Sequence, residues 1–114
     1  MDNDELVQNM LLELRRGVLS MAVLSQLSHE EYGYSLLKAL SDKGLEVDQS
    51  TLYPLLRRLE KNGWIASKWD LTEDRPRKFY TITPQGRALR AGLLDVWKNQ
   101  NRVLDEITKE TPHV

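Results

Sequence analysis

Leucines in the middle of the chain recur with a helical period. They stand at i, i+3, i+4 and i+7, the spacing that lines one side of an α-helix and buries that side against a core. The four are Leu52, Leu55, Leu56 and Leu59. Asp48 or Ser50 can cap this helix, and Gly63 is suited to end it. Because Pro54 has no N–H donor, we expect the residues before it to form only a loose first turn.

Two other apolar stretches precede this helix. Residues 4–27 are apolar on more than one side, so we expect a long helix covered either by two layers of its own fold or by its own fold and a second subunit. Residues 32–43 have one leucine-rich side and precede Gly44, which predicts a second helix. The alternating residues 45–47 suggest a short strand. Two helices joined by such a short connection are typical of a helix–turn–helix.

A period-two pattern replaces the helical one after Gly63. Residues 64–69 and 78–82 are rich in aromatic and β-branched side chains, and the polar residues 70–77 separate them. This arrangement predicts a β-hairpin with a long polar loop. A hairpin that follows a helix–turn–helix is the wing of a winged helix.

A long helix is predicted from Pro84 onward, since Thr83 is a hydroxyl cap and proline is favoured at the first helical position. Six positions then step by four and three residues in turn, which is the a/d seam of a coiled coil and requires a partner helix. They are Leu89, Leu93, Val96, Gln100, Val103 and Ile107. A polar residue such as Gln100 in this seam is typical of a position that sets register or partner choice.

The expected fold is mostly α with a small β-hairpin, in the α+β class. We expect a winged helix–turn–helix domain over residues 1–83, whose first helix also contributes to a dimer. A dimerisation helix over residues 84–111 and a frayed tail over residues 112–114 complete the chain.

Hydroxyl and cationic side chains on the outward side of the third helix and in the hairpin loop suit contact with DNA. Hydroxyls near a helix start can reach base edges or phosphates, and cations can bind the phosphate backbone. The residues expected to contact DNA are Tyr34, Ser35, Ser50, Thr51, Tyr53, Arg57, Arg58, Lys61, Arg75, Arg77 and Lys78. The alternative for both segments is an ordinary solvated surface, although a basic loop beside a basic helix favours a function.

Charge is unevenly distributed along the 114 residues, whose formal net charge is -1. Residues 34–90 contain 11 Lys or Arg against 7 Asp or Glu, and the two ends contain 5 against 10. A small basic surface on a neutral body favours DNA binding as a dimer, which doubles the contact. With no cysteine, and with His29 and His113 far apart in the sequence, we expect no metal site and no cofactor. No apolar run reaches the roughly 18 residues of a membrane span, so we expect a cytoplasmic protein that binds no membrane.

Four segments resemble the signature of the PadR family of winged-helix transcriptional regulators. They are residues 32–34, residues 50–60 with their Leu-Tyr-Pro tripeptide, Gly63, and residues 75–86 with the Arg-Lys-Phe-Tyr entry to the last strand. The resemblance spans residues 11–107. The single C-terminal helix is similar to the short branch of the family, which includes multidrug-binding repressors of bacterial transporter genes.

This resemblance implies a homodimer bound to a double-stranded DNA operator, with the C-terminal helix of each subunit packed on the first helix of the other. It also implies repression that a small aromatic or phenolic ligand relieves. The residues expected around that effector are Trp97, Val18, Leu14 and Leu11.

Other functions stay open at this point. A winged helix can serve as a protein-interaction module, but that role would not require so many cations together. A nonspecific architectural DNA-binding protein is a second alternative. An enzyme is the least favoured, because the sequence has no nucleophile–base pair, metal cluster or glycine-rich phosphate loop.

Overall fold

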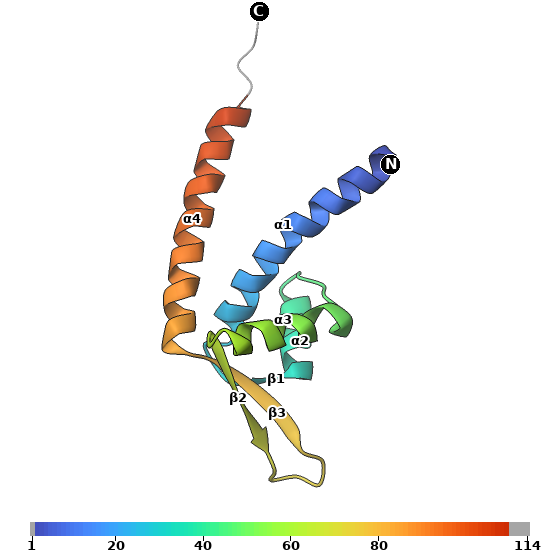
Figure 1. The fold of residues 1–114 in the computed structure, drawn as a ribbon, viewed down its shortest axis with the longest axis vertical. Coiled ribbons are helices and arrows are strands. Elements are labelled where there is room, and N and C mark those ends of the chain that lie inside the picture. Colours follow the sequence, from blue (N-terminus) through green and yellow to red (C-terminus); the bar gives the residue numbers. More distant parts are fainter. Residues whose placement is uncertain (1, 110–114) are drawn as a thin grey trace, which may run out of the picture.

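The computed structural model describes residues 2–109, which form four helices and a three-stranded sheet (Figure 1). In chain order the elements are α1 (Asn3–Gln26), β1 (Glu31–Tyr32), α2 (Gly33–Asp42), α3 (Gln49–Lys61), β2 (Ile65–Asp70), β3 (Arg77–Ile82) and α4 (Pro84–Thr108). The predicted α+β winged helix–turn–helix with a long C-terminal helix is confirmed. The tail expected at residues 112–114, and residue 111 at the expected end of the dimerisation helix, lie outside the described residues.

A carboxylate cap and two glycine turns define the helix–turn–helix. The Asp48 carboxylate accepts a hydrogen bond from the Thr51 backbone N–H at 2.9 Å and starts α3. Gly44 follows α2 with a φ of 96°, and Gly63 follows α3 with a φ of 77°. Because this left-handed region is strained for any residue with a Cβ, both glycines end their helices as the sequence indicated.

α3 continues through Pro54 without interruption, so the expected loose first turn is wrong. The backbone N–H groups of Thr51 and Leu52 already donate to the Asp48 carbonyl, at 3.2 and 3.0 Å. Pro54 cannot donate to the carbonyl of Ser50, four residues earlier. Both residues are exposed, so water can satisfy that carbonyl and the helix tolerates the proline.

The sheet has the order β1-β3-β2, and β3 is antiparallel to both neighbours. Its third strand is β1, where Tyr32 pairs with Phe79. The strand expected at residues 45–47 is wrong, because the chain there is irregular and uses Leu45 and Val47 to pack on the core. A two-residue strand is too short to show alternation, so only its pairing with β3 reveals it.

The core lies where the second half of α1 meets α2, α3 and the sheet (Figure 1). All four leucines of the α3 stripe are in it, as their period predicts. The buried apolar residues are Leu19, Val23, Leu24, Leu27, Leu36, Leu40, Leu52, Leu55, Leu56, Leu59, Ile65, Tyr80 and Ile82. No residue of α1 before Leu19 is buried, so the first half of that helix extends beyond the core.

α4 is attached to the body at its first turn. The Thr83 hydroxyl accepts a hydrogen bond from the Gly86 backbone N–H (3.0 Å) and donates one to the Gly63 carbonyl (2.6 Å). The Thr83 backbone N–H donates to the Trp64 carbonyl at 3.1 Å. A Cβ on Gly86 would overlap that carbonyl oxygen, so this close approach requires glycine. These contacts hold the end of α3 against the start of α4.

Beyond this junction α1 and α4 diverge (Figure 1). Their outer halves carry large apolar side chains that the chain itself leaves exposed. These are Leu6, Val7, Met10, Leu12 and Leu14 on α1, and Val96, Trp97, Leu104 and Ile107 on α4. None of the helices in residues 2–109 combines the length and the apolar character needed to cross a membrane.

Candidate nucleic-acid interface

The start of α3 presents Thr51 on the surface of the molecule. The hydroxyl of Ser50 donates to the Asp48 carboxylate at 2.7 Å, so Ser50 serves the helix cap. Hydrogen bonds from Ser50, and then from Thr51, lower the pKa of Asp48 below its usual value. Thr51 is exposed, and both its hydroxyl and its backbone N–H contribute to the lowered pKa of Asp48, so the hydroxyl lies close to that carboxylate.

The outward side of α3 carries cations in its last two turns. Arg57 and Lys61 are exposed and one helical turn apart, on the side opposite the buried leucines. Neither forms an ion pair with a described residue. Arg58 is also exposed but borders an apolar groove on the side of α1. Unpaired cations one turn apart are suited to neighbouring phosphates.

Tyr53 lies between α3 and α2 and not on the outward side of α3. Its half-buried side chain packs on the core, and a Cβ at Gly33 would lie 2.8 Å from its ring. Gly33 therefore leaves the space that the Tyr53 ring occupies. This position gives Tyr53 a role in packing the two helices together, and it does not support the expected contact with DNA.

The start of α2 presents one of its two candidate residues. Tyr34 is 73% exposed. The hydroxyl of Ser35 lies 2.5 Å from the Glu31 carboxylate and 3.0 Å from the Tyr32 carbonyl, so it is engaged in the corner between β1 and α2. Tyr34 is thus available for a partner, and Ser35 is not.

Lys78 faces α3 and fastens the wing to it. Its Nζ lies 3.7 Å from the Glu60 carboxylate and within 6 Å of the ring centroids of Trp69 (5.9 Å) and Tyr80 (5.7 Å). The Glu60 carboxylate also accepts a hydrogen bond from the Ser67 hydroxyl of β2. Because the ion pair is partly exposed, it contributes little to stability by itself. The ion pair holds the Lys78 ammonium on the side of the hairpin that faces α3.

The other two wing cations differ from Lys78 and from each other. The Arg77 guanidinium lies 4.1 Å from the centroid of the Tyr32 ring and 3.1 Å from the Glu73 carboxylate. Arg75 is exposed in the loop and forms no ion pair with any of residues 2–109. Of the three wing cations expected to contact DNA, one is therefore free and two are engaged.

Asp70 ties the base of the wing loop to β1. One carboxylate oxygen accepts hydrogen bonds from the Thr72 hydroxyl (2.6 Å) and backbone N–H (3.0 Å), and the other accepts one from the Tyr32 hydroxyl (2.6 Å). These bonds, those of Thr72 first, lower the pKa of Asp70 to about 2. The same hydrogen bond to Asp70 raises the pKa of Tyr32.

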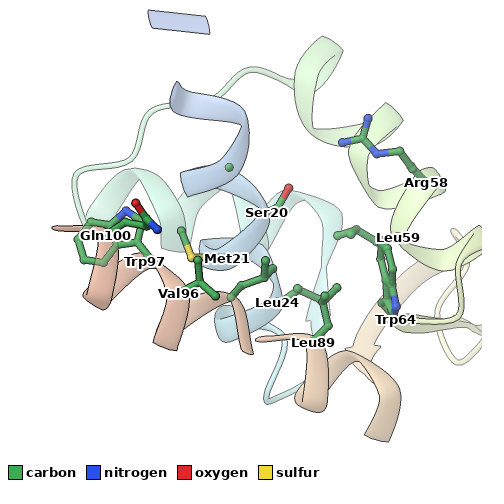
Figure 2. A pocket seen from close by; sticks show the side chains of 12 residues that line it. Ser20, Met21, Leu24, Arg58, Leu59, Trp64, Leu89, Val96, Trp97 and Gln100 are labelled. Atoms are coloured by element: carbon green, nitrogen blue, oxygen red, sulfur yellow. The ribbon is translucent and has the colours of Figure 1, made fainter. Parts of the chain in front are cut away.

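An apolar groove of about 450 Å³ lies between α1 and α4 and reaches the end of α3 (Figure 2). Its lining residues are Gly17, Ser20, Met21, Leu24, Arg58, Leu59, Trp64, Leu89, Leu93, Val96, Trp97 and Gln100. Trp97 and Trp64 lie toward opposite ends of it in Figure 2. Arg58 is the one charged residue in this lining. The volume is in the range of small-molecule sites.

Of the residues expected around the effector, the groove includes Trp97 but not Leu11, Leu14 or Val18. α1 instead contributes its neighbouring stripe, which begins at Gly17. Because α1 is apolar on several sides, its pattern could not show which side faces α4. Trp64, Arg58 and Leu59 were also missed as groove residues, since only the tertiary fold brings the end of α3 to this point.

The heptad seam of α4 has two different environments. Leu89 and Leu93 are half-buried and pack against the core of their own chain. Val96 and Ile107 are 59% and 71% exposed, and Gln100 is exposed as well. The first part of the seam thus packs within the chain, whereas the later part, apart from the half-buried Val103, is exposed.

A helix–turn–helix with cations on its outward side, followed by a β-hairpin wing, defines a winged-helix DNA-binding protein. Residues 21–91 match the model of the transcriptional regulator PadR-like family. The chain belongs to this family of transcriptional regulators, as the resemblance of its motifs indicated.

Individual relatives agree with this assignment over most of the chain. The chain is 32% identical over 99 residues to the transcriptional regulator Rv3488 of Mycobacterium tuberculosis, with 86% of each protein covered. It is similar to the crystal structure of a PadR family regulator from Eggerthella lenta, with a TM-score of 0.85, 42% identity and coverage of 95% of this chain and 96% of that one. A PadR-like regulator from Bacillus cereus has a TM-score of 0.76 and 26% identity, over 87% of this chain and 99% of that one.

Proposed function

We propose that the protein is a homodimeric repressor that binds a DNA operator through α3 and the wing. The observation that carries this proposal is the set of exposed cations that no described residue pairs, on α3 and at the tip of the wing: Arg57, Lys61 and Arg75. When such cations neutralise phosphates, they release the counterions condensed on the DNA, and this release drives binding. Thr51 at the start of α3 is the residue best placed to contact a base.

A second copy of the chain is the partner that fits the exposed halves of α1 and α4. The exposed half of α4 continues the heptad seam whose first part, Leu89 and Leu93, is already covered, and the exposed half of α1 carries large apolar side chains of its own. Association would cover this surface and would place two DNA-binding surfaces on one duplex. A dimer thereby doubles the few cations that each subunit offers.

A small planar aromatic ligand in the groove is the signal that we propose for release from DNA. Trp97 and Trp64 offer ring faces for stacking, and Leu59 and Arg58 of the lining belong to α3. A ligand in this groove would contact the dimerisation helix and the DNA-binding helix at once. It can release the DNA only if it binds more tightly to an arrangement of the dimer in which the two α3 helices no longer match the operator.

DNA binding is tested by fluorescence anisotropy with a duplex from the promoter of the protein's own gene and a random duplex of equal length. We expect preference for the promoter duplex and a steep loss of affinity with salt. Arg57→Ala should weaken both complexes and lower the slope of log K against log salt by about 0.9 per lost phosphate contact in each subunit. Thr51→Val should instead cost about 1–3 kcal/mol on the promoter duplex and little on the random one. Salt-independent binding, or no binding of either duplex, would contradict the proposal.

The ligand is tested by calorimetry with 1-naphthol, because Trp64 and Trp69 complicate a fluorescence signal. Trp97→Ala should weaken binding about tenfold while the protein remains dimeric and binds DNA nearly as before. Trp69→Phe is the matched control, since Trp69 lies on the wing outside the groove lining. Unchanged binding by Trp97→Ala would remove the groove from the mechanism of release.

A further inference from the structure

The wing loop is poorly equipped to bind phosphate by charge alone. Residues 71–76 contain two acidic side chains, Glu73 and Asp74, and one basic side chain, Arg75. With two acidic side chains against one basic side chain, a freely moving loop would on average repel a DNA backbone. Its contribution therefore depends on the direction in which Arg75 is held.

Tyr32 is the residue on which the restraints of this loop converge. Its hydroxyl donates to Asp70 at the last residue of β2, and its ring lies under the guanidinium of Arg77 at the first residue of β3. Asp70 and Arg77 are paired across the hairpin, so one side chain holds both strands where the loop begins. The Tyr32 ring also packs edge-on against Phe79, with centroids 6.0 Å apart.

The same contacts reduce the negative charge that the loop presents. Arg77 pairs with Glu73 while it lies on the Tyr32 ring, so this carboxylate has a cation beside it. Asp70 completes a turn with Thr72 and keeps its own carboxylate on the side of Tyr32. Arg75 is then the cation of the loop that has no partner among the described residues.

We infer that Tyr32 is a positioning residue for DNA binding: through Asp70 and Arg77 it orients the wing so that Arg75 contacts a phosphate. The inference rests on the proposed function and assigns the wing cations different tasks. Arg75 binds the backbone of the duplex, whereas Arg77 acts within the protein. Tyr32 itself does not contact DNA.

A double-mutant cycle between Tyr32 and Arg75 tests this inference on the promoter duplex. Arg75→Ala should lower the salt slope by about 0.9 in each subunit. Tyr32→Leu should cause a similar loss of slope, and adding Arg75→Ala to it should cause little further loss, because the contact is already gone. Tyr32→Phe keeps the ring under Arg77 and removes only the hydroxyl, so it should weaken binding by about 2- to 10-fold and retain part of the slope.

The matched control is the double-mutant cycle between Tyr32→Leu and Arg57→Ala. Their losses of binding free energy should add, because Arg57 lies on α3 and not on the wing that Tyr32 orients. If Tyr32→Leu merely reduces the folded fraction, the protein that stays folded will keep the salt slope of the unmodified protein. The losses of binding free energy caused by Tyr32→Leu and Arg75→Ala will then add. That result, or an unchanged slope for Arg75→Ala, overturns the inference. The proposed function fails separately, if the unmodified protein shows no salt-dependent binding to the promoter duplex.

Discussion

α3 and α4 have the same kind of apolar stripe but differ in what covers it. All four leucines of the α3 stripe are buried, with between 0% and 6% of each exposed. On α4 the single buried residue is Gly86, and Val96 and Ile107 of the stripe are mostly exposed. The two helices have similar patterns, but the α3 stripe is buried throughout, whereas the α4 stripe is half-buried at Leu89 and Leu93 and mostly exposed beyond them.

The difference shows what a helical period can predict. It indicates that an apolar stripe packs against something, but it does not identify the segment or subunit that covers it. α3 has 13 residues and lies across the core. α4 has 25 residues and is attached at one end, so at 1.5 Å per residue it extends about 37 Å from the junction with Trp64. Its second half extends beyond the core of its own chain, and most of its apolar side chains are exposed there.

Val96→Asp should give the largest effect and should separate the two helices most clearly. In the proposed dimer it would place an unpaired charge in a buried seam in each subunit, at about 3 kcal/mol or more per copy. We expect sedimentation velocity to show monomer at micromolar concentration, with a circular dichroism spectrum that retains the helices of the core.

Ala91→Asp is the matched control, because Ala91 is exposed and lies on the side of α4 opposite the seam. It should leave the dimer intact. A Val96→Asp protein that sediments as a dimer would show that the seam has another role.

Leu56→Ala should destabilise the fold of each subunit by about 2–5 kcal/mol, because the fully buried side chain of Leu56 lies in the core. Urea unfolding, followed by circular dichroism, measures this loss. Ile107→Ala removes the same kind of side chain from the exposed part of α4. We expect its effect to appear only as a stronger dependence of the unfolding temperature on protein concentration. Equal losses at both positions, independent of concentration, would contradict the contrast between the helices.

Gly86→Ala should destabilise the protein by about 1–3 kcal/mol, since the added methyl would overlap the Trp64 carbonyl and push α4 away from the end of α3. Gly92→Ala in the same helix meets no atom within 4 Å in the single chain. Alanine there should stabilise the helix by roughly 0.5–1 kcal/mol. Thermal unfolding of the two variants therefore tests whether the junction at Gly86 is as tight as the structure indicates.

The smallest effect concerns pH and the polar attachment of the wing. The pKa of Asp70 is lowered to about 2, so the stability it contributes is present above its unfolded pKa and is lost as the pH falls toward 2. The pKa of Tyr32 is raised, so its contribution is present below its unfolded pKa and is lost as the pH rises through the folded value. The difference in unfolding free energy between the unmodified protein and Tyr32→Phe should be constant from about pH 5 to 9. Urea unfolding at several pH values measures this difference. If the difference changes with pH between about 5 and 9, the Tyr32–Asp70 hydrogen bond is not its source.

Local patterns in the sequence were sufficient for the four helices, the hairpin and the outward, cationic side of α3. The leucine period, the glycines at 44 and 63 and the Thr83-Pro84 start each act within a few residues, so the chain shows them directly. For the same reason the outward position of Arg57 and Lys61 follows from the position of the leucines.

Only the tertiary structure decided which of these residues are free. Tyr53 fills the space that Gly33 leaves, Ser35 hydrogen-bonds at the corner before α2, and Arg77 lies on Tyr32, 45 positions earlier in the sequence. The groove likewise depends on which of several apolar sides of α1 faces α4. The helical period of the sequence shows on which side of its helix a side chain lies. Its contact partners, by contrast, come from distant segments that only tertiary packing brings together.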